Sequence, residues 1–195
     1  MTSTLKRAGA LIGIFVVLAA SLFGAVAPAL AQQGTPHLIL TLAGGDVDIQ
    51  LMPDIAPKHV ARIIELTSKG AYDGVVFHRV IDGFMAQTGD VKHGNADKGD
   101  VSRAGTGGSD YPNLKQEFSR EPHVRGVVSM ARAQNPDSAN SQFFIVFDDA
   151  RFLDKQYTVW GKVIEGMENV DKIKRGEPVR DPDKMVSVKV AADVK

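Results

Sequence analysis

The most informative stretch of the sequence runs from Phe77 to Asp90 and reads FHRVIDGFMAQTGD. It continues an apolar run that starts at Val75, and period-two alternation over residues 75–81 predicts a β-strand. One face of this strand would hold an arginine among three large apolar side chains: Arg79 with Val75, Phe77 and Ile81. A guanidinium is always charged and carries five donors, so it must either reach solvent or lie at the wall of a ligand pocket.

The second half of the stretch adds further parts of a pocket. An Asp-Gly turn signal follows the strand, and Phe84 and Met85 then supply a flat ring and a polarisable thioether. Gln87 adds a neutral amide two residues further on. Together with Arg79, these residues predict an apolar slot with polar donors along one edge.

This stretch closely resembles the signature of the cyclophilin family, and three further blocks are similar to other cyclophilin motifs. They are SMAR with NSQFFI at Ser129–Arg132 and Asn140–Ile145, FLD at Phe152–Asp154, and WGKV at Trp160–Val163. The order and spacing of the blocks resemble those of the family, and the resemblance covers roughly residues 37–190. It indicates a bacterial cyclophilin and implies a peptidyl-prolyl cis-trans isomerase.

Residues 1–31 have the features of a signal peptide. A basic pair, Lys6-Arg7, precedes the uncharged apolar run Ala8–Val26, and the segment ends in Ala-Leu-Ala, the small residues that signal peptidase requires. We expect cleavage after Ala31, which leaves residues 32–195 as one isomerase domain in the periplasm or another extracytoplasmic space. The alternative is an uncleaved membrane anchor, because about nineteen apolar residues could just cross a bilayer.

The remaining 164 residues are enough for one domain with a substantial core. Without Lys6 and Arg7, 21 basic residues stand against 23 acidic ones, which is a net charge of −2. This balance argues against a nucleic-acid partner and against binding to a membrane surface, since both favour a basic excess. The chain has no cysteine, which excludes a thiol nucleophile and a Cys-ligated metal. We expect a monomer that needs no cofactor.

Most of this sequence alternates with period two. A hairpin is predicted from residues 38–42 and 47–51, around a Gly-Gly turn signal. Further strand-like runs are Val127–Met130, Phe143–Phe147, Tyr157–Ile164 and Met185–Val190. Helical spacing appears in Pro57–Lys69 and more weakly in Gly166–Arg175. The pattern predicts a mainly β fold, a closed antiparallel barrel capped by two helices. The resemblance implies the same fold with eight strands.

The activity that the resemblance implies is rotation about an X-Pro amide bond, whose barrier is about 18–20 kcal/mol. No bond breaks, so the site needs no nucleophile and no metal. It needs a dry pocket for the proline ring and a donor aimed at the prolyl nitrogen, where electron density gathers as the amide loses planarity. The catalytic donor of the family corresponds to Arg79, oriented by Gln87. The family's proline pocket corresponds to Phe84, Met85, Phe144 and Leu153, with Phe84 and Phe144 counted among the catalytic residues.

Further substrate contacts are implied beside this pocket. The backbone of Ala131 and Arg132 would pair with a bound peptide, and Gln142 would be a second polar contact. Many cyclophilins carry Asn in place of Arg132, so this chain has an additional positive charge at the site. The rim includes Phe152, where vertebrate-type members have Trp, and Tyr157, where they have His. The resemblance also implies cyclosporin binding, and the missing indole N–H predicts that this binding is weak.

The run Gly105–Gly108 could cradle a phosphate, but it lacks the Lys-Ser/Thr pair and the strand-to-helix setting of a P-loop. The resemblance instead sets this run beside the peptide site. The polar segment before it, Val91–Arg103, is longer than in short cyclophilins. It either alters access to the site or is a tolerated surface insertion, and we favour the insertion.

The sequence indicates neither a catalytic or metal-binding histidine nor a catalytic serine. His78 is expected to be a core histidine with satisfied ring nitrogens, since it alternates with Arg79. The other four histidines lack the spacing and the carboxylate partners of a metal site. They are His37, His59, His93 and His123. Ser129 lacks a Gly-x-Ser-x-Gly elbow, and the sequence indicates no nucleophile with an adjacent base.

Three classes of function are therefore compared. The first is an exported isomerase that acts on proline-containing polypeptides. The second is a non-catalytic proline-binding module or chaperone on the same fold, and the third is an unrelated enzyme such as a hydrolase. The intact set of Arg79, Gln87 and Phe144 favours the isomerase. On pattern alone, Arg79 could equally be a surface residue that covers an apolar strand.

Overall fold

The structure is a computed structural model that describes residues 35–192. The leader expected at residues 1–31, and the cleavage site after Ala31, lie outside this range. Within the described range, no helix is both long and apolar enough to cross a bilayer.

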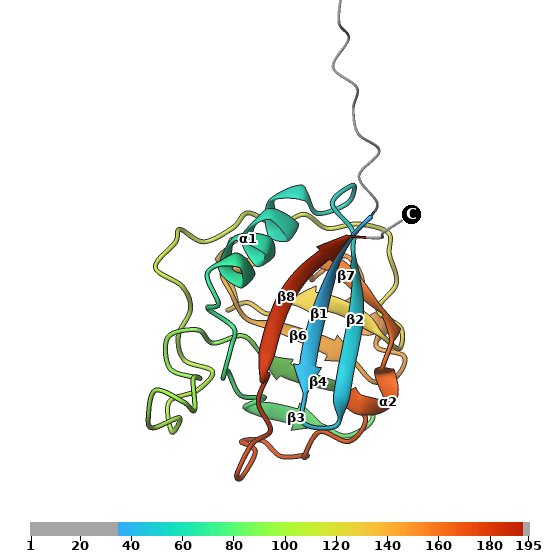
Figure 1. Ribbon diagram of the computed structural model, residues 1–195. Coiled ribbons are helices and arrows are strands. Elements are labelled where there is room, and N and C mark those ends of the chain that lie inside the picture. The colour runs from blue at the N-terminus through green and yellow to red at the C-terminus, as the bar shows by residue number, and fades with distance from the viewer. Residues whose placement is uncertain (1–34, 193–195) are drawn as a thin grey trace, which may run out of the picture. The chain divides into compact units, whose positions relative to one another are not determined.

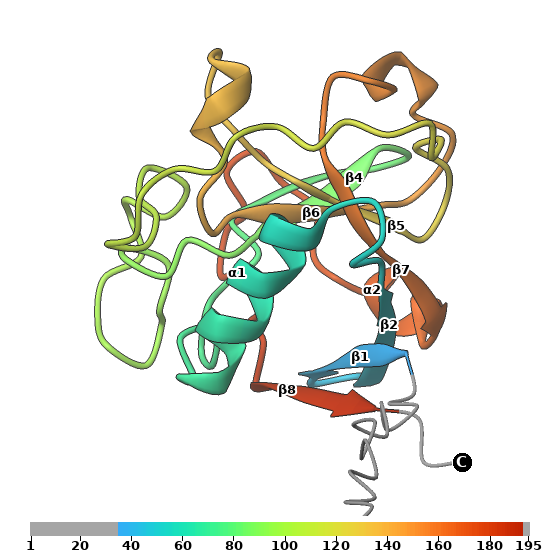
Figure 2. The ribbon, with the colours of Figure 1, turned by 90° about the horizontal axis from the view of Figure 1, so that it is seen from above.

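Within residues 35–192, eight strands form one antiparallel sheet, which curls around a core as Figures 1 and 2 show. The strands are β1 (Pro36–Leu42), β2 (Gly45–Leu51), β3 (Arg79–Ile81), β4 (Met85–Thr88), β5 (Val127–Met130), β6 (Phe143–Val146), β7 (Val159–Glu165) and β8 (Ser187–Ala192). Their order across the sheet is β3-β4-β6-β5-β7-β2-β1-β8. The expected hairpin is β1–β2, and the expected strand 127–130 is β5.

The sheet is an open half-barrel, so the closed barrel expected from the sequence is wrong. Strands β3 and β8 stand at the two edges of the sheet. The segment that leads into β8 meets residues near β3 only through isolated bridges, Val80 with Gly176 and Val76 with Lys184. Two prolines in this segment lack the N–H that a continuous ladder would need: Pro178 and Pro182.

Helix α1 (Pro57–Ser68) starts with a proline in its first turn, where a missing N–H costs nothing. It lies beside β8 and buries one face, including Val60, Ile63 and Leu66. Helix α2 (Met167–Val170) is shorter than the predicted Gly166–Arg175. The chain tightens after it, because Ile173 N bonds to the third rather than the fourth preceding carbonyl, that of Val170. The described part of the chain also contains two single 3₁₀ turns, η1 (Pro136–Ser138) and η2 (Arg151–Leu153).

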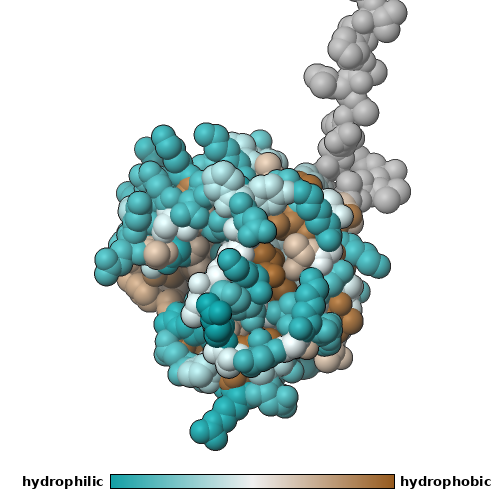
Figure 3. Space-filling view, turned by 90° about the vertical axis from the view of Figure 1, so that its left-hand side faces the viewer, coloured by the Kyte–Doolittle hydropathy of each residue, from teal (hydrophilic) through white to brown (hydrophobic). Residues whose placement is uncertain are grey.

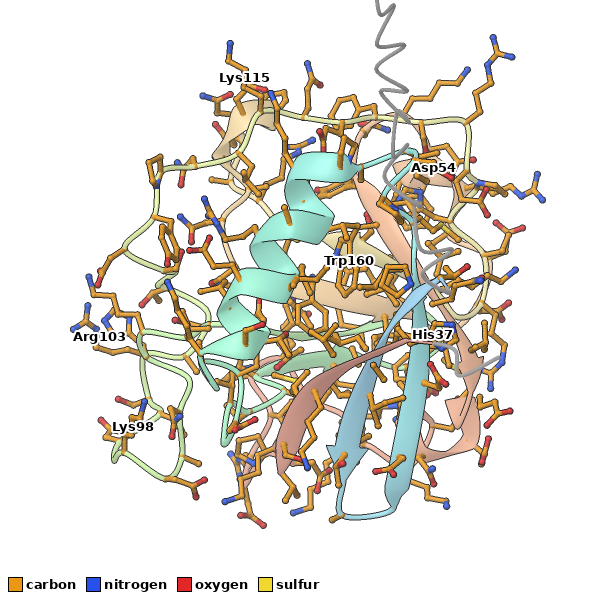
Figure 4. All side chains as sticks on the ribbon, turned by 45° about the horizontal axis from the view of Figure 1, so that its top comes forward. His37, Asp54, Lys98, Arg103, Lys115 and Trp160 are labelled. Carbon is orange, nitrogen blue, oxygen red and sulfur yellow. The ribbon has the colours of Figure 1, made fainter. Side chains whose placement is uncertain are left out.

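Both faces of the central strands are buried. On β6, Phe143 and Ile145 belong to the main core, whereas Phe144 and Val146 belong to a second apolar cluster on the opposite face. Figure 4 shows Trp160 in the main core between α1 and the sheet. The second cluster includes Met85 and Leu153. It therefore forms an apolar floor on the outer side of the sheet, and the candidate site lies on this floor.

Candidate active site

A cavity of about 140 Å³, which we call the apolar pocket, opens above the second cluster. Nine residues line it: Arg79, Phe84, Met85, Gln87, Ala131, Arg132, Phe144, Leu153 and Tyr157. All nine were expected as site residues from the sequence. The structure thus brings together four segments that lie far apart in the chain.

The pocket floor follows from the pairing of β4 with β6. Met85 pairs with Val146 and Gln87 with Phe144, so alternate residues of the two strands point to the same side. Met85, Phe144 and Leu153 are buried, at 1%, 4% and 8% exposure. The Phe144 ring packs edge-to-face on Tyr157 at 5.8 Å. The pocket is therefore apolar at its base.

Arg79 lies at the pocket wall, but its neighbours differ from those expected. Val75 and Phe77 are fully buried in the main core, whereas Arg79 lines the pocket and Ile81 packs on the second cluster. The expected strand 75–81 is reduced to Arg79–Ile81, because residues 77–78 leave the strand conformation and break the alternation. Arg79 consequently shares a side with Ile81 and not with Val75 or Phe77.

A chain of amides leads away from Arg79. Its Nη1 donates to Gln87 Oε1 at 3.5 Å, and Gln87 Nε2 donates to Gln142 Oε1 at 3.0 Å. Gln142 Nε2 then donates to the carbonyls of Gly105 and Gly107 at 3.0 and 2.8 Å. Gln142 does not line the apolar pocket, but it holds Gln87 and the glycine loop in place. The last of the expected residues, Phe152, is 65% exposed at the rim and contacts the Phe84 ring at 5.4 Å.

Asp90 is an organising residue that sequence reasoning missed. It is fully buried, and its Oδ2 accepts hydrogen bonds from Gly105 N and Gly107 N, both at 2.8 Å. Its Oδ1 accepts from Lys92 N and His93 N at 3.1 and 2.9 Å. Two of the glycine N–H groups that could have met a phosphate, those of Gly105 and Gly107, thus donate to a carboxylate of the same chain. Only the position of Asp90 at the end of the signature stretch could have drawn attention to it.

The segment Val91–Arg103 borders a second, larger hollow of about 650 Å³, which we call the polar cavity. Lys92, His93 and Arg103 line it together with Gln87 and Gln142, so it adjoins the apolar pocket. Figure 3 views the side on which this segment lies and shows a largely hydrophilic surface. In Figure 4, Lys98 and Arg103 point outward from the segment. The segment therefore has an outer part at the surface and an inner part beside the site.

Three histidines have carboxylate partners, contrary to expectation. The Nδ1 atoms of His37, His59 and His123 lie 2.9, 2.7 and 3.0 Å from oxygens of Asp48, Glu117 and Asp154. Burial lowers the pKa of His59 and of His123, and the carboxylates offset only part of this effect. Among residues 35–192, no three acidic or histidine side chains are grouped so that they could hold a metal.

His78 is buried beneath the glycine loop and is 8% exposed. A Cβ at Gly105, whose φ is +95°, would lie 2.8 Å from the His78 ring, so the glycine permits this close packing. Burial lowers the pKa of His78. In the described part of the chain, neither ring nitrogen has a hydrogen-bond partner of good geometry. His78 is therefore buried, as expected, but the expectation that its ring nitrogens are satisfied is wrong.

The structure also contains a serine with an adjacent base, which the sequence did not indicate. His123 Nε2 lies 3.1 Å from Ser129 Oγ, and its Nδ1 faces Asp154. Both His123 and Ser129 are fully buried, and the His123 ring stacks on Phe144 at 6.3 Å. A substrate carbonyl cannot reach this serine. The arrangement is part of the packing below the pocket and gives no support to a hydrolase.

Comparison with known proteins agrees with this geometry. Residues 37–192 match the family described as cyclophilin type peptidyl-prolyl cis-trans isomerase/CLD. A probable peptidyl-prolyl cis-trans isomerase of Brucella suis biovar 1 (strain 1330) is 60% identical over 178 residues, covering 88% of this chain and 91% of the relative. Peptidyl-prolyl cis-trans isomerase A of Dickeya dadantii (strain 3937) is 38% identical over 155 residues, covering 76% of each.

Two crystal structures share the fold. Cyclophilin AquaCyp293 from Hirschia baltica has a TM-score of 0.68 at 32% identity, covering 78% of this chain and 73% of that one. A Cryptosporidium parvum cyclophilin type isomerase, crystallised in the presence of the dipeptide Ala-Pro, has a TM-score of 0.68 at 25% identity, covering 80% and 99%. The chain therefore belongs to the cyclophilin-type peptidyl-prolyl cis-trans isomerases, and it is an enzyme of that family.

Proposed function

We propose that this isomerase holds the proline ring of an X-Pro segment in the apolar pocket while Arg79 donates a hydrogen bond to the prolyl nitrogen. The observation that carries the proposal is the position of Arg79 and Gln87 at the wall of a pocket whose base is formed by Met85, Phe144 and Leu153. As the amide twists, its nitrogen regains a lone pair, and a donor aimed at that lone pair stabilises the twisted state more than the planar one.

The energy required is within reach of such a site. The uncatalysed barrier is about 18–20 kcal/mol, and lowering it by about 7 kcal/mol gives an acceleration of roughly a hundred-thousandfold. Burying the proline ring in an apolar pocket removes water from the amide nitrogen, and a donor is stronger where water is excluded. No step needs a covalent intermediate or a metal.

The peptide on either side of the proline would lie along Ala131 and Arg132. The Arg132 guanidinium is held by the carbonyls of Gln156, Ala133 and Gln134 at 2.8–3.2 Å, and it lies 4.5 Å from the centre of the Tyr157 ring. Its position is thus fixed by this chain's own backbone. We assign it a role in shaping the rim rather than a direct role in the isomerisation.

The natural substrates are proposed to be proline-containing segments of exported proteins, and the enzyme is proposed to act as a monomer outside the cytoplasm. Support comes from the signal-peptide features of residues 1–31. N-terminal sequencing of the protein from cell fractions tests this part. A chain that starts at Gln32 in the soluble extracytoplasmic fraction is expected, and an intact Met1 in membranes would show that the segment is an anchor.

Activity itself is tested with purified residues 32–195 in a protease-coupled assay on a short X-Pro peptide. Catalysed cis-to-trans conversion is expected. If the protein binds proline peptides but leaves their isomerisation rate unchanged, the site is a binding module, and the proposed mechanism is wrong.

A further inference from the structure

Glu177 lies beside the guanidinium of Arg79, although the two residues are 98 positions apart in the chain. Arg79 Nε donates a hydrogen bond to Glu177 Oε1 at 2.5 Å. Sequence patterns gave Glu177 no role, and none of the blocks that carry the family resemblance contains it. The contact therefore adds a residue to the neighbourhood of the proposed donor.

The main chain fixes this contact. Val80 and Gly176 form an antiparallel bridge in which each N–H donates to the other's carbonyl at 2.8 Å. The residues that flank an antiparallel bridge face each other, so the bridge sets Glu177 opposite Arg79. Further along, Val179 N donates to the His78 carbonyl at 3.1 Å. Backbone hydrogen bonds on both sides of Glu177 thus place its carboxylate beside Arg79.

Glu177 and Gln87 together restrain the arginine plane. Glu177 accepts from Nε, and Gln87 accepts from Nη1 at 3.5 Å. Since all the guanidinium N–H groups lie in one plane, two acceptors at different nitrogens fix its orientation. The other N–H groups remain available at the pocket that Arg79 lines. The contact with Gln87 is long for a hydrogen bond, so Glu177 is the stronger of the two restraints.

A carboxylate beside a catalytic cation could also act against catalysis, because it offsets the positive charge that stabilises the twisted amide. The two effects predict opposite results when the carboxylate is removed. The side chains of Arg79 and Glu177 are 37% and 57% exposed, and water screens the charge of such a pair strongly. Orientation therefore outweighs neutralisation at this site.

We propose that Glu177 is a positioning residue for Arg79, holding the guanidinium in the plane from which its remaining N–H groups reach a bound prolyl nitrogen. The inference rests on the proposed role of Arg79. Removing Glu177 should therefore lower the rate of isomerisation. Because the pair is partly exposed, the stability of the fold should be nearly unaltered.

The test compares three single variants in the isomerase assay: Glu177→Ala, Glu177→Gln and, as a matched control, Glu168→Ala on the exposed side of α2. Glu177→Ala is expected to lower kcat by about three- to tenfold with KM changed by less than about twofold, because orientation matters mainly in the transition state. Glu177→Gln keeps an acceptor of the same length and should retain at least about half of the wild-type kcat. Glu168→Ala should behave as wild type, and all melting temperatures should agree.

A double variant separates positioning from a general structural effect. In the Arg79→Ala background, Glu177→Ala should cause no further loss, because the residue that it positions is gone. An unchanged or raised kcat in Glu177→Ala overturns the inference, as does an equal loss with and without Arg79. If Arg79→Ala keeps the wild-type kcat/KM, the proposed role of Arg79 is wrong, and the role of Glu177 is wrong with it.

Discussion

Arg79 and Gln87 face each other across the β3–β4 ladder, and the side-chain oxygen of Gln87 accepts a hydrogen bond from Arg79. The orientation of that amide is set further away. The side-chain nitrogen of Gln142 donates hydrogen bonds to the carbonyls of Gly105 and Gly107, so its side-chain oxygen accepts the hydrogen bond from Gln87. Gln87 must then use its nitrogen on that side and turn its oxygen to Arg79. The carbonyls of Gly105 and Gly107 thus determine, through Gln142, that Gln87 turns its oxygen and not its nitrogen toward Arg79.

Asp90 anchors that loop, and its removal should destabilise the protein. Four backbone N–H groups donate to this buried carboxylate, and Asp90→Ala would leave them unsatisfied. The expected loss is about 3 kcal/mol or more in the free energy of unfolding, measured by urea titration. Asp110→Ala, at an exposed position after the same loop, is the control and should change it by less than about 0.5 kcal/mol. A loss below about 1 kcal/mol in Asp90→Ala would contradict this account.

Acid should destabilise the fold through its buried histidines. Burial lowers the pKa of His59, against an opposing effect of Glu117, and burial also lowers the pKa of His78 and of His123. A group whose pKa is lower in the folded state binds protons more readily when unfolded, so stability is lost as the pH falls below about 6.5, the ordinary histidine value. The melting temperature should therefore be lower at pH 5.5 than at pH 7.5.

Glu117 extends the same trend to lower pH. Burial alone would raise its pKa, but hydrogen bonds from the His59 ring and from the N–H groups of His59 and Lys58 hold the pKa below the ordinary value of 4.5. His59→Gln should reduce the pH dependence of the melting temperature relative to wild type. Equal slopes in wild type and His59→Gln would show that this pair does not cause the acid sensitivity.

Phe152 should limit cyclosporin affinity without limiting catalysis. It lies at the rim on Phe84, outside the residues that line the apolar pocket. A tryptophan there would add an indole N–H and about 20–40 Å² of apolar contact, together worth about 1–2.5 kcal/mol. Phe152→Trp is expected to tighten binding by about five- to seventyfold in calorimetric titration, with kcat/KM within about twofold of wild type. Equal affinity in the two proteins would show that the rim ring is not the limit.

The parts of the structure that depend on local pattern could be predicted from the sequence. The run Val127–Met130 is β5 with the expected ends, because a short apolar run is buried on both faces of the sheet. The residues at the base of the apolar pocket were implied by the family resemblance, and the structure has Met85 and Phe144 on the neighbouring strands β4 and β6.

The parts that depend on distant contacts could not be predicted. Glu177 meets Arg79 across 98 residues, and Glu117 meets His59 across 58. No local period encodes either pair. The face of Arg79 was misassigned because the chain leaves the strand conformation at residues 77–78. The sheet stays open because the proline-containing segment before β8 meets residues near β3 only through isolated bridges. Strand propensity does not predict how these two distant segments meet.

The central claim is that Arg79 acts on the twisted amide rather than on folding, and the isomerase assay of Arg79→Ala tests it most directly. Arg79 is 37% exposed and lies at a pocket wall, so the variant should fold with an unchanged melting temperature. Its kcat/KM should fall at least about tenfold, because the lost hydrogen bond forms mainly in the transition state. A folded Arg79→Ala protein with the wild-type kcat/KM would contradict the account.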